Sequence, residues 1–368
     1  MNKAMFAIMG AVIGIGAFIL SWQGNPANTG ICVSCFMENI AGALHLHDNI
    51  RMQYLRPELP GFVLGSFMFS LWRREFASTG GSSPLLRFLI GMLLIIGCAV
   101  FIGCPVKLFL RLAGGDIGAI AGLAGLTAGI YVGLEFVANG FQLGVAGPTP
   151  KSNGLILPGL MFFFLTLAYF QPSFIAASTK GAAAQHAPFF LALGIGLAIG
   201  AFAQLTKFCI TGGIARIFLW GPRELMNCPR STGMLISLVS FFGFALATSL
   251  LTGQFSFGLH GQPSSNESYG WAFLGMLLVG FGSVLIRGCP LRQLVAAGQG
   301  DNDAGVTVMG MLVGAAMVQN WNLGGTPAGS PLSAQVAVLA GICLLFVVGM
   351  LNRRRGYGIA PEYQVGLD

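Results

Sequence analysis

Charged residues are scarce in this chain of 368 residues. Lys, Arg, Asp and Glu make up 8% of it, whereas about 25% is usual in soluble proteins. Hydrophobic residues account for 55%. A soluble protein of this length would need far more polar surface to cover its core. We therefore expect the chain to lie in a lipid bilayer, where apolar side chains can face the surroundings.

Other absences narrow the choice further. The sequence has no Gly-rich phosphate-binding motif of the Walker A type, so we do not expect ATP to drive the protein directly. The eight cysteines lie mostly in or beside apolar segments and not in the loops of a disulfide framework. The net charge of +7 comes from basic residues at the ends of apolar runs, which is typical of membrane proteins. We expect no nucleic acid partner, no cofactor and no metal ion.

Apolar runs predict an all-α integral membrane protein with nine or ten spanning helices, because about 20 apolar residues cross the hydrocarbon core as a helix. The predicted spans are 4–20, 59–73, 85–102, 117–138, 154–170, 187–206, 231–252, 270–287, 304–320 and 332–350. Further stretches are too apolar for plain loops and too short to span, so we expect re-entrant half-helices buried in the protein. These stretches are 32–46, 106–113, 209–220 and 291–297.

The positions of Lys and Arg predict the orientation. Arg353, Arg354 and Arg355 follow the last span, so we expect the C-terminus on the cytoplasmic side of the inner membrane. With ten spans the N-terminus lies there too. The loops 253–269 and 321–331 carry no Lys or Arg and are expected outside.

The most informative signal is an internal repeat. The segment 103–107 reads GCPVK and the segment 288–292 reads GCPLR, and after seven more residues each is followed by Gly-Asp. A weaker pair joins the sequence CVS at 32–34 to CIT at 209–211. Each half of the chain therefore contains a cysteine, two spans and a second cysteine.

The repeat predicts how the chain is organised. We expect a first membrane repeat at 1–170, a connecting loop at 171–186, a second repeat at 187–350 and a cytoplasmic tail at 351–368. Five spans in each half is an odd number, so the second repeat should be inverted relative to the first. Cys104 would then lie toward the outside and Cys289 toward the inside.

Each part of the motif has a physical interpretation. Its proline suits the first turn of a short helix, whose N-terminal N–H groups favour an anion. Lys107 and Arg292 add positive charge, while Gly103 and Gly288 allow close approach of the backbone.

The thiols of Cys104 and Cys289 are the unusual part of the motif. They are soft groups that can contact an anion or exchange with it. Asp116 and Asp301, in the Gly-Asp pairs, are expected to cap the helices that follow.

With these motifs the sequence resembles the YeeE/YedE family of membrane transporters over nearly the whole chain. The resemblance implies a transporter, not an enzyme, that imports a thiosulfate-like anion through a central path of cysteines. That role falls on Cys32, Cys104 and Cys289, with Cys209 as a weaker fourth. Segments 30–36 and 53–58 look more like the branch described as selenium transporters, so sulfur and selenium both stay open. The family often works with a small cytosolic sulfur-carrier protein.

The repeat and the resemblance together define the candidate site. Its expected pathway residues are Cys32, Cys104, Cys209, Cys289, Lys107, Arg292, Gly103 and Gly288, with Cys35 and Cys228 as accessory candidates. An alternative is a membrane thiol–disulfide or quinone-linked oxidoreductase that uses Cys32 and Cys35, but it leaves the second GCP motif unexplained. A channel-like structural protein without specificity leaves all the cysteines unexplained.

Overall fold

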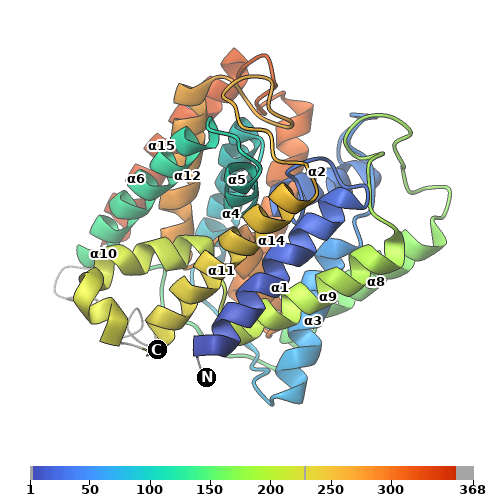
Figure 1. The fold of residues 1–368 in the computed structure, drawn as a ribbon. Helices are drawn as coiled ribbons and strands as arrows, with labels where there is room; N and C mark the ends of the chain where they lie inside the picture. Colours follow the sequence, from blue (N-terminus) through green and yellow to red (C-terminus); the bar gives the residue numbers. More distant parts are fainter. Residues whose placement is uncertain (1–2, 228, 354–368) are drawn as a thin grey trace.

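The structure is a bundle of long helices with short helices between them (Figure 1). The computed structural model describes residues 3–227 and 229–353. The first half contains α1 (Lys3–Trp22), α2 (Val33–Ala43), α3 (Glu58–Trp72), α4 (Pro84–Phe101), α5 (Pro105–Ala113), α6 (Ala119–Ala138), α7 (Lys151–Gly154) and α8 (Ile156–Phe170). The second half contains α9 (Phe189–Thr206), α10 (Ile210–Asn227), α11 (Pro229–Leu251), α12 (Tyr269–Leu285), α13 (Pro290–Gly298), α14 (Asn302–Asn320) and α15 (Leu332–Leu351). The described residues also form one small antiparallel sheet from β1 (Thr79–Gly80) and β2 (Gly147–Pro148).

All ten predicted spans are helical, and the prediction of an all-α protein with many apolar helices is confirmed. Eight helical segments of the described chain are long and apolar enough to cross a membrane. Two of these eight join a long helix to the short helix after it, α4 to α5 and α12 to α13, and a third joins α9 to the first part of α10. Of the ten predicted spans, those outside the eight are α3 and α14. Helix α3 has 15 residues and is about 22 Å long at 1.5 Å per residue, and α14 has polar residues at both ends.

The short helices α2, α5 and α13 lie where half-helices are expected. The prediction for 209–220 is wrong in length, because α10 continues to Asn227 and has 18 residues. The Arg-Glu-Leu-Met sequence at 223–226 consists of residues with high helix propensity, which favours this extension.

The long helices pair mainly across the two halves of the chain. One group contains α1 packed on α11 and α3 packed on α9, and a second group contains α4 packed on α14 and α6 packed on α12. The short helices contact both groups: α13 lies against α3 and α14, and α5 against α6 and α11. In Figure 1, α5 lies between α1 of the first group and α6 and α12 of the second. The N-termini of the short helices are thereby held inside the protein.

Glycine permits the closest of these helix contacts. A Cβ atom added at Gly65 of α3 would lie 2.1 Å from the carbonyl oxygen of Leu197 in α9. At Gly125 of α6 it would lie 2.0 Å from the carbonyl oxygen of Phe273 in α12. Such distances allow no side chain, so glycine sets the helix separation, as is common where helices associate in lipid.

Candidate functional site

The first thiol cluster consists of Cys32, Cys35 and Cys104, with Lys107 beside them. Cys32 precedes α2 and Cys104 precedes α5, each as the N-cap residue. The backbone N–H of Cys104 donates to Sγ of Cys32 at 3.5 Å. Sγ of Cys32 also lies 2.8 Å from Sγ of Cys35. The N-termini of two short helices therefore meet at one pair of thiols, where their partial positive charges add.

The second thiol cluster consists of Cys209 and Cys289, with Arg292 beside them. Cys289 is the N-cap residue of α13, and Cys209 directly precedes α10. The backbone N–H of Cys289 donates to Sγ of Cys209 at 3.4 Å. The N–H of Gly212 donates to the same sulfur at 3.3 Å. Two cysteines that are 80 residues apart thus repeat the contact made in the first half by cysteines 72 residues apart.

A left-handed residue stands two positions before each of the four cysteines. The φ angles are +46° at Gly30, +62° at Ile102, +54° at Lys207 and +64° at Arg287. Three of these residues are not glycine, although the left-handed region is costly for other residues. The sharp turn ends the preceding segment and aims the next N–H groups at a thiol. No local sequence signal predicted it.

The motif glycines make room for the basic side chains. A Cβ at Gly103 would lie 2.7 Å from Cδ of Lys107, and a Cβ at Gly288 would lie 2.8 Å from Cγ of Arg292. Neither glycine is among the residues with positive φ. Their role in this structure is therefore close packing of the aliphatic part of a Lys or Arg, which lets the cation fold back toward the cysteines.

The two cations have different surroundings. Lys107 is 2% exposed, and its Nζ lies 3.9 Å from Sγ of Cys35. Arg292 donates from Nη2 to Oε1 of Gln299 at 3.3 Å, while its Nη1 is buried and has no hydrogen-bond partner among the described residues. An unpaired buried donor is costly, so the second cluster offers a donor suited to an anion.

The two aspartates of the repeat have different roles. Asp301 caps α14, since its Oδ1 accepts from the N–H of Ala304 at 3.0 Å. The same prediction for Asp116 is wrong, because α6 begins after Gly118 without a side-chain cap. Asp116 forms an ion pair with the buried Arg111 at 2.7 Å instead. The second half has Ala296 at the matching position, so its aspartate is free to cap the helix.

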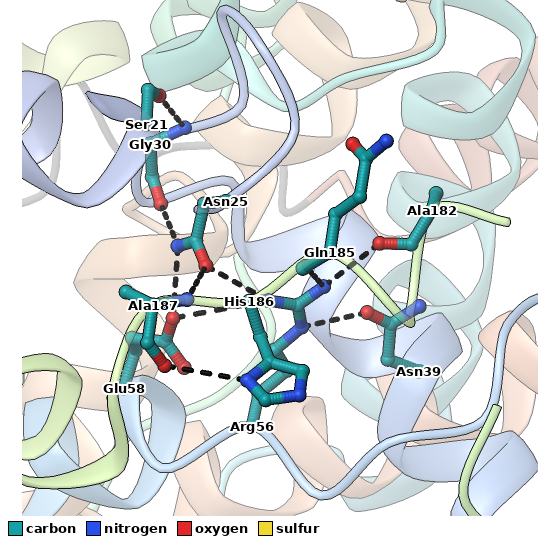
Figure 2. Close-up of polar contacts among 10 residues, drawn as sticks. All are labelled: Ser21, Asn25, Gly30, Asn39, Arg56, Glu58, Ala182, Gln185, His186 and Ala187. Atoms are coloured by element: carbon teal, nitrogen blue, oxygen red, sulfur yellow. Dashed lines mark hydrogen bonds and ion pairs between the residues drawn. The ribbon is translucent and has the colours of Figure 1, made fainter. Parts of the chain in front are cut away.

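A buried arginine holds the connecting loop against the first half (Figure 2). Arg56 donates from Nε to Asn39 of α2 at 2.7 Å and from Nη1 to Asn25 at 2.9 Å. Its Nη2 donates to the carbonyl oxygens of Ala182 at 3.2 Å and Gln185 at 2.9 Å. Its hydrogen bonds thus tie three segments together, and we infer that Arg56, in the segment 53–58, is structural.

The sequence missed several neighbours of the first cluster. Cys98 of α4, which has no place in the repeat, is fully buried beside Ser34 and Cys32. Glu38, one turn beyond Cys35 in α2, accepts a hydrogen bond from Gln319 of α14. A buried polar residue in an apolar helix was the available signal for Glu38. The accessory candidate Cys228 and the tail beyond residue 353 lie outside the described residues.

Comparison with models of known protein families and with curated proteins gives no match for this chain. The fold fits a multi-pass membrane protein, since eight helical segments of the described chain are long and apolar enough to cross a lipid bilayer. Its candidate site consists of two buried thiol clusters, each with a basic side chain.

Proposed function

We propose that this chain is a membrane transporter, with the inverted repeat of the YeeE/YedE family, that imports a small sulfur- or selenium-containing anion. The observation that carries this proposal is the matched construction of the two thiol clusters. In each, a cysteine N–H at the start of a short helix donates to the thiol of another cysteine. A basic side chain follows the motif cysteine by three residues in both. Two copies of one soft, positively charged site suit successive stations of one anion.

The helix pairing supports a two-fold relation between the halves, which the proposed inverted repeat requires. By the repeat, α1, α3, α4 and α6 of the first half correspond to α9, α11, α12 and α14 of the second. Exchanging the halves therefore turns the pair α1–α11 into α9–α3 and the pair α6–α12 into α14–α4, and all four pairs occur. The ends of α5 and α13 also contact different loops: Gly114 accepts from the N–H of Ser256 at 2.9 Å, and Gln299 accepts from the N–H of Ala77 at 3.1 Å. The loop that contains Ser256 carries no Lys or Arg and is expected outside, whereas the loop that contains Ala77 follows Arg73 and Arg74 and is expected inside.

In this proposal the anion moves inward from the first cluster to the second. A thiol donates a hydrogen bond to it or exchanges with it, and Lys107 and Arg292 balance its charge. Both chain ends lie on the cytoplasmic side of the inner membrane. A small sulfur-carrier protein receives the substrate on that side. The protein performs no enzymatic reaction of its own.

Uptake into vesicles tests the proposal directly. The purified protein, reconstituted as the sole protein, should accumulate labelled thiosulfate, selenite or selenide faster than empty vesicles. The labelled species that accumulates fastest identifies the substrate. Failure to take up any of the three would overturn the proposed function.

The inversion has its own test. A membrane-impermeant thiol reagent should modify Cys104 from the outside and Cys289 from the inside, measured in single-cysteine variants in oriented vesicles. Modification of both from the same face rules out the inverted repeat while leaving transport open.

One observation favours a second function. Cys32 and Cys35 form a C-x-x-C pair at a helix N-terminus with their sulfurs 2.8 Å apart, the arrangement of thiol–disulfide oxidoreductases. If the chain is such an oxidoreductase, Cys35→Gly should abolish its activity toward a quinone or a dithiol. A transporter should keep most of its uptake after the same substitution.

A further inference from the structure

Glu38 is an acidic residue buried next to the first thiol cluster. It lies in α2, three residues after Cys35, so the two side chains are neighbours on the helix. The residue is 7% exposed. Its Oε2 accepts a hydrogen bond from Nε2 of Gln319 in α14, and no ion pair is recorded for it among the described residues. A buried carboxylate without an ion pair costs free energy, so its protonation depends on the charges around it.

Glu38 faces groups from several elements. Cys35 interacts with it electrostatically from its own helix, and Cys32 does so from the N-cap of that helix. Lys107 does so from α5, and Cys98 from α4. Nε2 of His47 contacts its backbone carbonyl oxygen at 2.9 Å rather than its carboxyl group.

Lys107 is the cation of this group, so the charge on Glu38 depends on what else Lys107 faces. An anion bound beside Lys107 removes the stabilisation of the carboxylate and favours uptake of a proton.

The second half does not repeat this arrangement. Matching Cys32 to Cys209 places Ala215 opposite Glu38 (38 + 177 = 215). Matching the Gly-Asp pairs places Leu134 opposite Gln319 (319 − 185 = 134). Both counterparts are apolar and buried. One copy of the repeated architecture therefore forms without this polar pair. This indicates that Glu38 and Gln319 serve the activity of the first cluster and not the fold.

The side chain of Gln319 links the carboxyl group of Glu38 to the protein surface. Oε1 of Gln319 accepts from Nδ2 of Asn49 at 2.7 Å, and Asn49 is exposed. Asn49 lies between the first two predicted spans, and the ten-span topology with a cytoplasmic N-terminus places that segment outside. A proton from external water thus needs to pass only one side chain to reach Glu38, and intramembrane carboxyl groups in such positions are typical of proton-coupled pumps and transporters.

We propose that Glu38 is the proton-carrying group of this transporter and that the proton is its coupling ion. External water supplies one proton to Glu38 when a small anion binds beside Lys107. The proton leaves to internal water when the anion moves on, and no other bond forms or breaks. Anion and proton therefore cross together, and a proton gradient drives accumulation. This inference rests on the proposed function.

The test uses the full-length protein in liposomes, with the membrane potential clamped at zero. Labelled thiosulfate and selenite are the probes. For one proton per anion, an inward gradient of one pH unit should give about tenfold accumulation by the wild type. Glu38→Gln should lose this accumulation but still exchange labelled for unlabelled anion. Glu75→Gln, which changes an exposed carboxylate beside Arg73, is the matched control and should behave as the wild type.

A second measurement does not depend on transport. Infrared difference spectra of the purified protein should show the band of a protonated carboxyl group when anion is added. Glu38→Gln should lose that band, and Glu75→Gln should keep it.

The outcomes separate the two proposals. Wild-type uptake that ignores the proton gradient overturns the role of Glu38 alone, as does a gradient response or an infrared band retained in Glu38→Gln. Absence of wild-type uptake of thiosulfate, selenite and selenide alike overturns the proposed function, and the coupling with it.

Discussion

The two thiol clusters share a backbone plan and differ in their chemistry. Both have a left-handed residue two positions before each cysteine that precedes a helix, and a cysteine N–H that donates to a second thiol. The first cluster adds Cys35, where the second has Gly212. Its cation contacts a sulfur, whereas Arg292 of the second cluster keeps a donor unpaired. A duplicated scaffold therefore holds two sites that differ in their number of thiols and in the contacts of their cations, which suits entry and exit of one anion.

The strongest way to break the comparison is to remove both motif thiols. Cys104→Ala combined with Cys289→Ala should abolish uptake, because neither cluster then keeps its cysteine side chain at the start of α5 or α13. Each single alanine variant should lower uptake roughly tenfold or more, since a hydrogen bond to a charged group is worth about 1.5–3 kcal/mol. Uptake of labelled thiosulfate and selenite by the stable variants measures this.

Serine at the same positions sharpens that result. It keeps a donor of similar shape and removes the soft sulfur. If Cys289→Ser retains uptake while Cys289→Ala loses it, hydrogen bonding suffices. Loss in both indicates affinity for sulfur or exchange chemistry. Normal uptake by the double alanine variant would show that transport does not depend on the thiols of Cys104 and Cys289.

The two aspartates of the repeat should differ in their effect on stability. Asp116→Ala leaves the buried Arg111 unpaired and should destabilise the protein by about 3–5 kcal/mol. Asp301→Ala removes a helix cap and should cost about 1 kcal/mol. Thermal unfolding in one detergent compares the two variants. Adding Arg111→Met to Asp116→Ala should recover stability, and equal losses for both aspartates would contradict their assigned roles.

The two cations should differ in anion affinity. Arg292→Gln removes the unpaired Nη1 donor and should raise the KM for uptake about tenfold, as expected for one lost charge-assisted hydrogen bond. Lys107→Gln should raise it less, because the ammonium group of Lys107 already contacts Cys35. Arg292→Lys is the matched control that keeps the charge without the planar fork. A larger KM effect at Lys107 would contradict the assignment of the available donor to Arg292.

Exchanging Cys35 and Gly212 should have the smallest effect on transport. Copper–phenanthroline should join Cys32 to Cys35 in the wild type, since their sulfurs are already 2.8 Å apart, and Cys35→Gly should prevent this. In Cys35→Gly with Gly212→Cys, the disulfide should move to Cys209, because a Cβ at position 212 lies 3.3 Å from Cβ of Cys209. Mass spectrometry of peptides detects either bond. No disulfide in the wild type would contradict the close approach of the sulfurs.

The element boundaries could be predicted because their signals are local. Apolar runs of sufficient length placed the long helices, and the Cys-Pro pairs marked the starts of α5 and α13. A proline has the backbone angle of a first helical turn already built in. The extension of α10 was missed, since helix propensity alone does not mark an end as a cap does.

The partners of each residue were decided by tertiary structure. The repeat pointed to Cys32 with Cys104 and to Cys209 with Cys289, but only the crossing of short helices between the two helix groups brings each N–H to a sulfur. The contact of Glu38 with Gln319, across 281 residues, had no counterpart in the repeat to reveal it.

Composition and local periodicity by themselves determined that this chain is a helical protein suited to a bilayer, where its helices lie and which motifs recur. Burial of apolar side chains and completion of backbone hydrogen bonds act within single segments, so a segment's own residues reveal them. Which aspartate caps and which pairs, which residue turns left-handed and which carboxyl group stands beside the thiols depend on the packing of helices far apart in the chain. Those contacts exist only once glycine-lined helices have closed on one another.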